Sequence, residues 1–143
     1  MATKEYGICL PADDVRYAVE VMGKFMGIPI DVQAIEDAFD AGDEIIDADA
    51  PEDIFTPECV AIFYDPSNHN NVIVADLGYG DWLQMVHVRC EKENAKAVHD
   101  KLLFVDTVIR ESAGEHTNKF LDERTGNSKC GILSVEKKYG IKI

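Results

Sequence analysis

Carboxylates are the most abundant chemically reactive side chains in the middle of this chain, and their simplest use would be to bind a cation. Asp47-Ala-Asp49 begins in the same way as a calcium-binding loop. Such a loop needs a glycine at its sixth position, because about seven oxygen ligands must converge around a sharp turn. Pro51 and Glu52 follow instead, and the four histidines lack the spacing that places two imidazoles on one helix face. The sequence therefore predicts neither a metal site nor a cofactor.

A cysteine, a histidine and an acid could form a nucleophilic site if the fold brought them together. Cys59, Asp76 and His87 fall in or beside three consecutive predicted strands, and neighbouring strands lie about 5 Å apart in a sheet. Any three strands produce such coincidences, however, and a cysteine in an apolar run is more often a small core residue. With Asp81, these side chains define one hypothesis, a small-molecule pocket or a small enzyme site near the three strands.

A glycine-rich turn, Gly78-Tyr79-Gly80, separates the second and third of these strands. A phosphate-binding loop needs a helix directly after its glycines, whereas a strand is predicted here. The glycines instead suit a hairpin turn, in which they adopt positive φ. Tyr79, Asp81 and Trp82 would then be exposed together, a composition suited to anchoring a protein partner.

The net charge of −13, from 14 basic and 27 acidic residues, comes entirely from one segment. Residues 25–88 contain 14 acidic residues and no Lys or Arg, whereas the rest of the chain carries 13 acidic and 14 basic residues. A surface adapted only for solubility would be acidic throughout, so we expect a localised negative face. Such a face repels nucleic-acid phosphates and anionic membranes and attracts basic protein surfaces. The alternative interpretation is a solvated surface with no partner.

Apolar periodicity predicts a strand and then a helix in the N-terminal part of the chain. The strand covers residues 6–10, and the helix would be capped by Asp13 or Asp14 and ended by Gly27. Its predicted core face consists of Val15, Ala18, Val19, Met22, Phe25 and Met26.

A second helix and an acidic connector are predicted next. Asp31 is the expected cap, and Gly42 would end the helix, so that residues 43–57 form the connector. The helix has only a narrow apolar stripe, formed by Val32, Ile35, Ala38 and Phe39. The segment contributes little to a core, and its carboxylates are therefore expected on the surface.

Three strands and a long helix are predicted in the second half of the chain. The expected strands are residues 59–64, 72–75 and 82–90. Their connections, including a loop at 65–71, are short enough to require an antiparallel meander. The first of the three strands is a continuous apolar run and is predicted to be buried on both faces. A helix over 92–112 follows, with a short helix at 117–124 and a last segment, 128–143, that fits either a helix or a strand.

Together these elements predict one α+β domain over residues 1–143. The order would be β-α-α-β-β-β-α-α, with a three- to four-stranded, mainly antiparallel sheet and helices packed on one face. No apolar run approaches the ~20 residues needed to cross a membrane. The N-terminal residues lack the apolar run of a secretory signal, and the four cysteines lack a disulfide pattern, so we expect a reducing, cytoplasmic location.

The residue pattern favours an interaction protein over an enzyme. We expect the chain to present its acidic face to a basic surface, such as that of a nucleic-acid-binding protein, and not to bind nucleic acid itself. In the sharpest form it mimics nucleic acid and inhibits its partner, as phage-encoded anti-restriction and anti-CRISPR proteins do. A further hypothesis is an assembly subunit whose apolar faces pair with those of another copy. The predicted partner-binding residues are Asp37, Asp40, Asp43, Glu44, Asp47, Asp49, Glu52, Asp53, Tyr79, Asp81 and Trp82.

Overall fold

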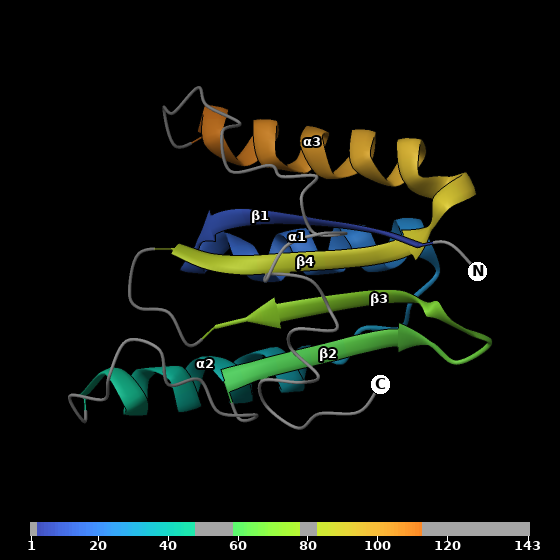
Figure 1. The fold of residues 1–143 in the computed structure, drawn as a ribbon. Helices are drawn as coiled ribbons and strands as arrows, with labels where there is room; N and C mark the ends of the chain where they lie inside the picture. Colours follow the sequence, from blue (N-terminus) through green and yellow to red (C-terminus); the bar gives the residue numbers. More distant parts are fainter. Residues whose placement is uncertain (1–2, 48–58, 78–82, 113–143) are drawn as a thin grey trace.

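The computed structural model describes residues 3–47, 59–77 and 83–112, in which a four-stranded sheet forms one layer and three helices form the other (Figure 1). In chain order the elements are β1 (Thr3–Pro11), α1 (Ala12–Met26), α2 (Val32–Asp47), β2 (Val60–Asp65), β3 (Asn68–Asp76), β4 (Leu83–Glu91), a 3-10 turn η2 (Lys92–Asn94) and α3 (Ala95–Ser112). The predicted α+β class and the order β-α-α-β-β-β-α are confirmed. The segments predicted at 117–124 and 128–143 lie outside the described residues.

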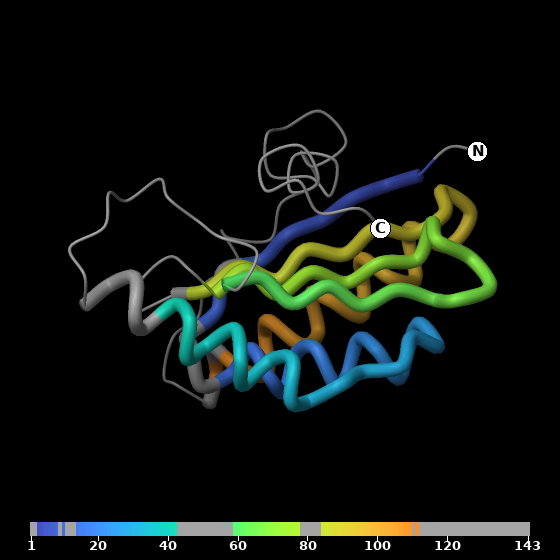
Figure 2. Tube along the Cα trace, turned by 90° about the horizontal axis from the view of Figure 1, so that it is seen from below, coloured from blue at the N-terminus to red at the C-terminus, as the bar shows by residue number. Residues whose placement is uncertain are grey.

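The sheet has the strand order β1-β4-β3-β2, and each neighbouring pair is antiparallel. The helices lie on one side of it, as Figure 2 shows along the edge of the sheet. We call the side that faces the helices the inner face and the opposite side the outer face. On the inner face, α3 packs against β1, α2 packs against β2, and α1 lies between them beneath the central strands.

The hydrophobic core fills the space between the inner face and the helices. Because side chains alternate along a strand, every second residue of each strand reaches this core. The strand residues in it are Tyr6, Ile8, Leu10, Ala61, Phe63, Ile73, Ala75, Val86, Val88 and Cys90. The predicted apolar stripe of α3 supplies Ala95, Val98, Leu102, Val105 and Ile109, all of them buried.

Two expectations about burial were wrong. The strand predicted to be buried on both faces is β2, yet Tyr64 is 40% exposed, because β2 is an edge strand. The central strand β3 takes that role instead, with residues 72–76 buried on both faces. Phe25 was assigned to the core face of α1 and is 46% exposed.

Some of the predicted ends of α1 and α2 are confirmed, and others are wrong. Gly27 ends α1 with a φ of 72°, and the Ile28 N–H donates to the Gly23 carbonyl at 2.8 Å, which is the Schellman arrangement. The Gln33 N–H donates to Asp31 Oδ1 at 3.0 Å, so Asp31 caps α2 as predicted. Asp13 and Asp14, the predicted alternatives for the cap of α1, both lie inside the helix, which begins at Ala12, and therefore do not precede it as caps.

Gly42 does not end α2, which continues to Asp47. A glycine inside a helix costs only about 1 kcal/mol, and apolar residues recur at Ile45 and Ile46 with helical spacing. Gly42 is itself buried, at a position where a small residue fits against the core side of the helix. The first part of the predicted acidic connector is therefore helical.

The predicted loop at 65–71 is shorter than expected, because Asn68 already begins β3. Asp65 forms the turn by accepting hydrogen bonds from the Ser67 N–H at 2.9 Å and the Ser67 hydroxyl at 2.7 Å. These hydrogen bonds lower the pKa of Asp65. The Asn70 amide donates to Glu91 on β4 at 3.3 Å, so side-chain contacts with β4 support the extended asparagine run.

Candidate functional site

Helix α2 gathers the largest group of carboxylates for which the backbone is described. A repeat of 3.6 residues per turn places positions 36, 37, 40, 43, 44 and 47 within an arc of about 120°. The buried or partly buried Ile35, Ala38, Phe39 and Gly42 occupy a separate arc that faces the sheet. The helix contains no Lys or Arg. One side of α2 is therefore apolar and another side is acidic along most of its length.

Asp37 and Asp40 are the members of this acidic arc whose side chains are described as exposed. Asp37 accepts a hydrogen bond from the Gln33 side-chain amide at 2.9 Å, which leaves its charge in place. Glu36 differs, because Arg16 on α1 donates to it at 3.0 Å while also lying 3.6 Å from Glu20. The Arg16–Glu36 pair marks the border of the acidic arc on the side of α1.

The remaining predicted partner-binding residues are described only in part or not at all. Positions 43, 44 and 47 belong to the backbone of α2, and nothing is described of their side chains. The other predicted residues, which are Asp49, Glu52, Asp53, Tyr79, Asp81 and Trp82, lie outside the described part of the chain. Their role in binding a partner stays a prediction.

Two residues of the alternative pocket, Asp76 and His87, lie on the same side of the sheet. Asp76 pairs with Met85 and Val74 pairs with His87, so Asp76 and His87 are diagonal neighbours on the outer face. Both are buried, with 8% and 3% of their surfaces exposed. Cys59 is buried just before β2, where its carbonyl accepts a hydrogen bond from the Leu77 N–H at 2.8 Å.

His87 is a neutral imidazole at physiological pH. Burial lowers its pKa to about 4, because the charged form would lose its hydration. Nδ1 has no hydrogen-bond partner among the described residues. Gly7 on β1 lies opposite His87, and a methyl group added there would come within 3.2 Å of His87 Nδ1. The missing side chain of Gly7 is what makes room for the imidazole.

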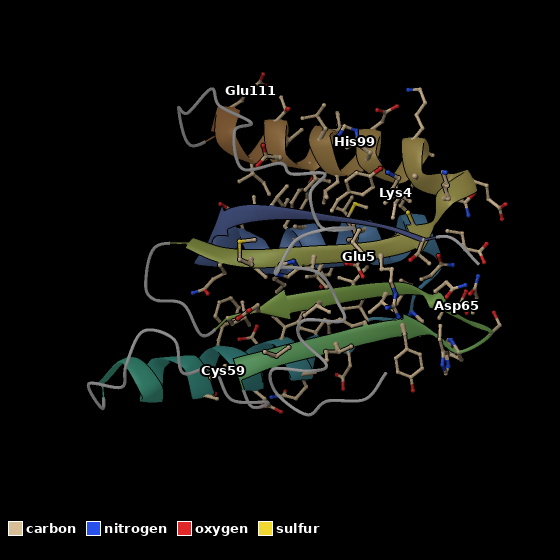
Figure 3. All side chains as sticks on the ribbon, in the orientation of Figure 1. Lys4, Glu5, Cys59, Asp65, His99 and Glu111 are labelled. Carbon is tan, nitrogen blue, oxygen red and sulfur yellow. The ribbon has the colours of Figure 1, made fainter. Side chains whose placement is uncertain are left out.

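A charged pair lies next to His87 along β4. Arg89 and Glu5 are opposite each other on β4 and β1, with the guanidinium 3.9 Å from the carboxylate. Only 13% and 9% of these side chains are exposed, and Figure 3 labels Glu5 on the outer face. Arg89 also donates to the His69 carbonyl at 3.1 Å. Sequence reasoning missed this pair, because only the strand register brings residues 5 and 89 together.

Two cysteines whose side chains are described, Cys59 and Cys90, are poor candidates for a nucleophile. Both are buried and unbridged. Burial, with a smaller effect of the Glu91 charge, raises the pKa of Cys90 to about 11, so its thiol stays protonated. Within the described ranges, no three His, Cys, Asp or Glu side chains gather as a bound cation would require. Among these same residues, no helix has the length and apolar character to span a membrane.

Comparison of the chain with models of known protein families, with curated proteins and with solved structures gives no match. The function must therefore be argued from the residues themselves.

Proposed function

We propose that this chain is a small acidic interaction protein that presents the outward side of α2 to a basic surface on another macromolecule. The observation that carries the proposal is the exposed pair Asp37 and Asp40 on a helix without a single Lys or Arg. Attraction between an acidic surface and a basic surface speeds association and fixes the orientation of the two partners. Added salt shortens the distance over which this attraction acts. The chain would therefore bind its partner quickly at low salt and weakly at high salt.

The density of charge on α2 supports the sharper form of the proposal, a nucleic-acid mimic. Besides Glu36, which is paired with Arg16, five carboxylates fall between positions 37 and 47. At 1.5 Å per residue, this is one carboxylate for about every 3 Å of helix axis. One strand of DNA carries a phosphate for about every 3.4 Å of its axis. A groove that accepts a phosphate backbone could accept this helix, and the inhibition would resemble that of phage anti-restriction or anti-CRISPR proteins.

The direct test is competition with nucleic acid for an identified partner. The full chain, immobilised at about 0.1 M salt, is used to capture proteins from cells of its source, and a captured basic protein is then purified. Labelled duplex DNA bound to that protein should be displaced by the wild-type chain. The variant Asp37→Asn/Asp40→Asn should need about tenfold more protein for the same displacement.

A matched control separates this local effect from net charge. Glu20→Gln/Glu111→Gln removes the same two charges from exposed positions on α1 and α3, and Arg16 keeps Glu36 as its partner. This control should displace DNA as the wild type does. Equal activity of both double variants, or capture that does not weaken with salt, would count against the acidic side of α2 as the binding surface.

The alternative of a small-molecule site rests on one observation, the buried imidazole of His87 beside Asp76 on the outer face. Its Nδ1 is free of hydrogen bonds in the described part of the chain. A ligand reaching this face would change the imidazole resonances of His87 in NMR spectra. Mixtures of small metabolites that shift these resonances would support the alternative. A basic protein that shifts only resonances of α2 would support the interaction protein.

A further inference from the structure

A second surface, on α1 and α3, differs from the acidic side of α2 in both shape and charge. Phe25 on α1 and Phe104 on α3 are 46% and 55% exposed, although both are large apolar side chains. The ammonium group of Lys101 lies 5.6 Å from the centre of the Phe25 ring and 5.2 Å from that of Phe104. These distances are typical of cation–π contacts, so one positive charge contacts both rings.

A hollow of about 270 Å³ lies beside Phe25 and is lined by Phe25, Met26, Asn71, Asn94, Ala97 and Val98. An apolar cavity of about 150 Å³ is large enough to hold benzene, so this hollow can accept a large side chain. We call Phe25, Lys101, Phe104 and this hollow the aromatic patch. It combines exposed apolar area with a recess, as protein-binding surfaces do.

The charge around the aromatic patch is opposite to that of α2. In the described part of the chain, the lysines that form no ion pair are Lys101, Lys24 next to Phe25, and Lys92 in η2. The other described cations have partners, such as Asp100 for Lys96 and Glu36 for Arg16. Glu91 and Glu93, on either side of Lys92 in the chain, offset its charge, which leaves Lys24 and Lys101 as the positive charges of the patch. The patch therefore suits an acidic partner.

The chain itself supplies such a partner in the acidic side of α2. The two surfaces cannot meet within one molecule, because α2 packs on the β2 edge of the sheet and α3 packs on the β1 edge (Figure 1). They can meet between two molecules. We propose that the acidic side of α2 in one copy docks on the aromatic patch of a second copy.

This contact is heterologous, since it joins two different surfaces, and it therefore leads to rings or to open chains of copies. It uses the same acidic side of α2 as the proposed function and in that respect rests on it. Binding of a basic partner and docking of a second copy would exclude each other. Self-association would keep the acidic side covered until a partner with stronger positive charge displaces it.

Exposed ion pairs contribute little on their own, so the apolar area of Phe25 and Phe104 must add to the attraction. The net charge of −13 on each copy opposes association at low salt. At about 0.15 M salt the screening length is about 8 Å, which weakens this overall repulsion more than the contacts at the interface. The contact should therefore be strongest at intermediate salt.

Sedimentation of the full chain at increasing concentration and about 0.15 M salt tests the proposal. The wild type should sediment as larger species as its concentration rises. Two charge-reversed variants, Lys24→Glu/Lys101→Glu and Asp37→Lys/Asp40→Lys, should associate more weakly. Each should need a protein concentration at least about tenfold higher than the wild type to form the same species. An equal mixture of the two should associate again, because each variant supplies the surface that the other lacks.

Three controls make the result specific. Lys96→Glu reverses a lysine of α3 that is already paired with Asp100, and it should associate as the wild type does. Phe104→Ser removes apolar area without changing charge and should weaken association. Circular dichroism confirms that each variant is folded.

A wild type that stays monomeric at every concentration overturns the proposal, as does a mixture no larger than its components. Loss of association in Lys96→Glu would also overturn the proposal, because it would show that association depends on net charge and not on the aromatic patch. The proposed function is tested separately by competition with DNA. A monomeric chain that still displaces DNA from its partner would remove only the docking of a second copy.

Discussion

The two faces of the sheet are made by the same strands but differ in the ionisable groups that they bury. The inner face presents side chains such as Ile8, Ile73 and Val86, which are completely buried against the helices. The outer face presents Glu5, Asp76, His87 and Arg89, which are also largely removed from water. Strand alternation allows this division, because each step along a strand moves to the other face. The inner face stabilises the fold mainly by apolar area, whereas the outer face also makes stability depend on the ionisation of buried groups.

The contrast follows from what burial costs each kind of group. Removing apolar area from water is favourable at any pH, whereas an ionisable group must be neutral, paired or hydrogen-bonded when it is buried. His87 meets this condition by staying neutral, and Arg89 meets it with Glu5 and the His69 carbonyl. Mutations of apolar side chains on the inner face should therefore change stability equally at all pH values, whereas mutations of the buried ionisable groups of the outer face should not.

The largest effect is expected from the inner face. Ile73→Ala removes a fully buried side chain from the central strand β3 and should lower the free energy of unfolding by about 3–4 kcal/mol. Urea denaturation measures this loss, and the loss should be the same at pH 7 and pH 5. Phe104→Ala truncates an apolar side chain that is 55% exposed and should change stability by less than about 1 kcal/mol. Equal losses from the two truncations would contradict the position of the core.

The next effect belongs to the outer face and depends on pH. The pKa of His87 is about 4 in the folded chain, compared with 6.5 for a histidine that is not buried, as in the unfolded chain. As the pH falls from about 6.5 to 4, the unfolded chain binds a proton that the folded chain does not, so stability is lost over this range. A shift of this size corresponds to about 3 kcal/mol.

Carboxylates also titrate in this range, so the prediction concerns a difference between two chains. His87→Leu should lose about 3 kcal/mol less than the wild type between pH 7 and pH 4. His69→Gln, which removes an exposed imidazole that contacts Tyr64, should follow the wild type. Parallel losses in the wild type and His87→Leu would show that the folded chain takes up the proton, and the outer face would then not exclude charge.

The sequence predicted those parts of the fold that depend on local pattern. The apolar stripe of α3, the cap at Asp31 and the stop at Gly27 each require only neighbouring residues. The errors at Gly42 and at Phe25 have another cause. Gly42 stays helical because apolar spacing continues beyond it, and Phe25 lies exposed beside Lys101 of α3 and outside the core. Such outcomes depend on tertiary packing, which overrides local preference.

The candidate site divides in the same way. The run without Lys or Arg located the acidic helix, because charge is visible in the sequence. The pairing of Arg16 with Glu36 and of Glu5 with Arg89 was not visible, since these residues are distant in sequence and only the fold brings them together. The role of Gly7 was hidden for the same reason, because its neighbour His87 comes from a strand formed 80 residues later.

A smaller effect is expected where the outer face is most crowded. A methyl group added by Gly7→Ala would lie 3.2 Å from His87 Nδ1 and 3.6 Å from Met85 Cε. The neighbours must shift, and the cost should be about 1–2 kcal/mol in thermal or urea unfolding. The same substitution in a His87→Ala background should cost less than about half as much, because the imidazole is absent. Equal costs in both backgrounds would mean that Gly7 is required for a reason other than His87.

The smallest effect is expected from charges that face water. Lys96 pairs with Asp100 at 2.7 Å, but the lysine side chain is 89% exposed. The pair has a lysine on the N-terminal side, which is the weaker orientation for residues four apart on a helix, and a positive charge in the first turn opposes the helix dipole. Lys96→Met should therefore leave the free energy of unfolding almost unchanged, and salt should remove any remaining difference. Urea denaturation with and without added salt measures both. A loss as large as that of Gly7→Ala would mean that solvent does not screen charges on the helical layer, and the contrast with the buried groups of the outer face would no longer hold.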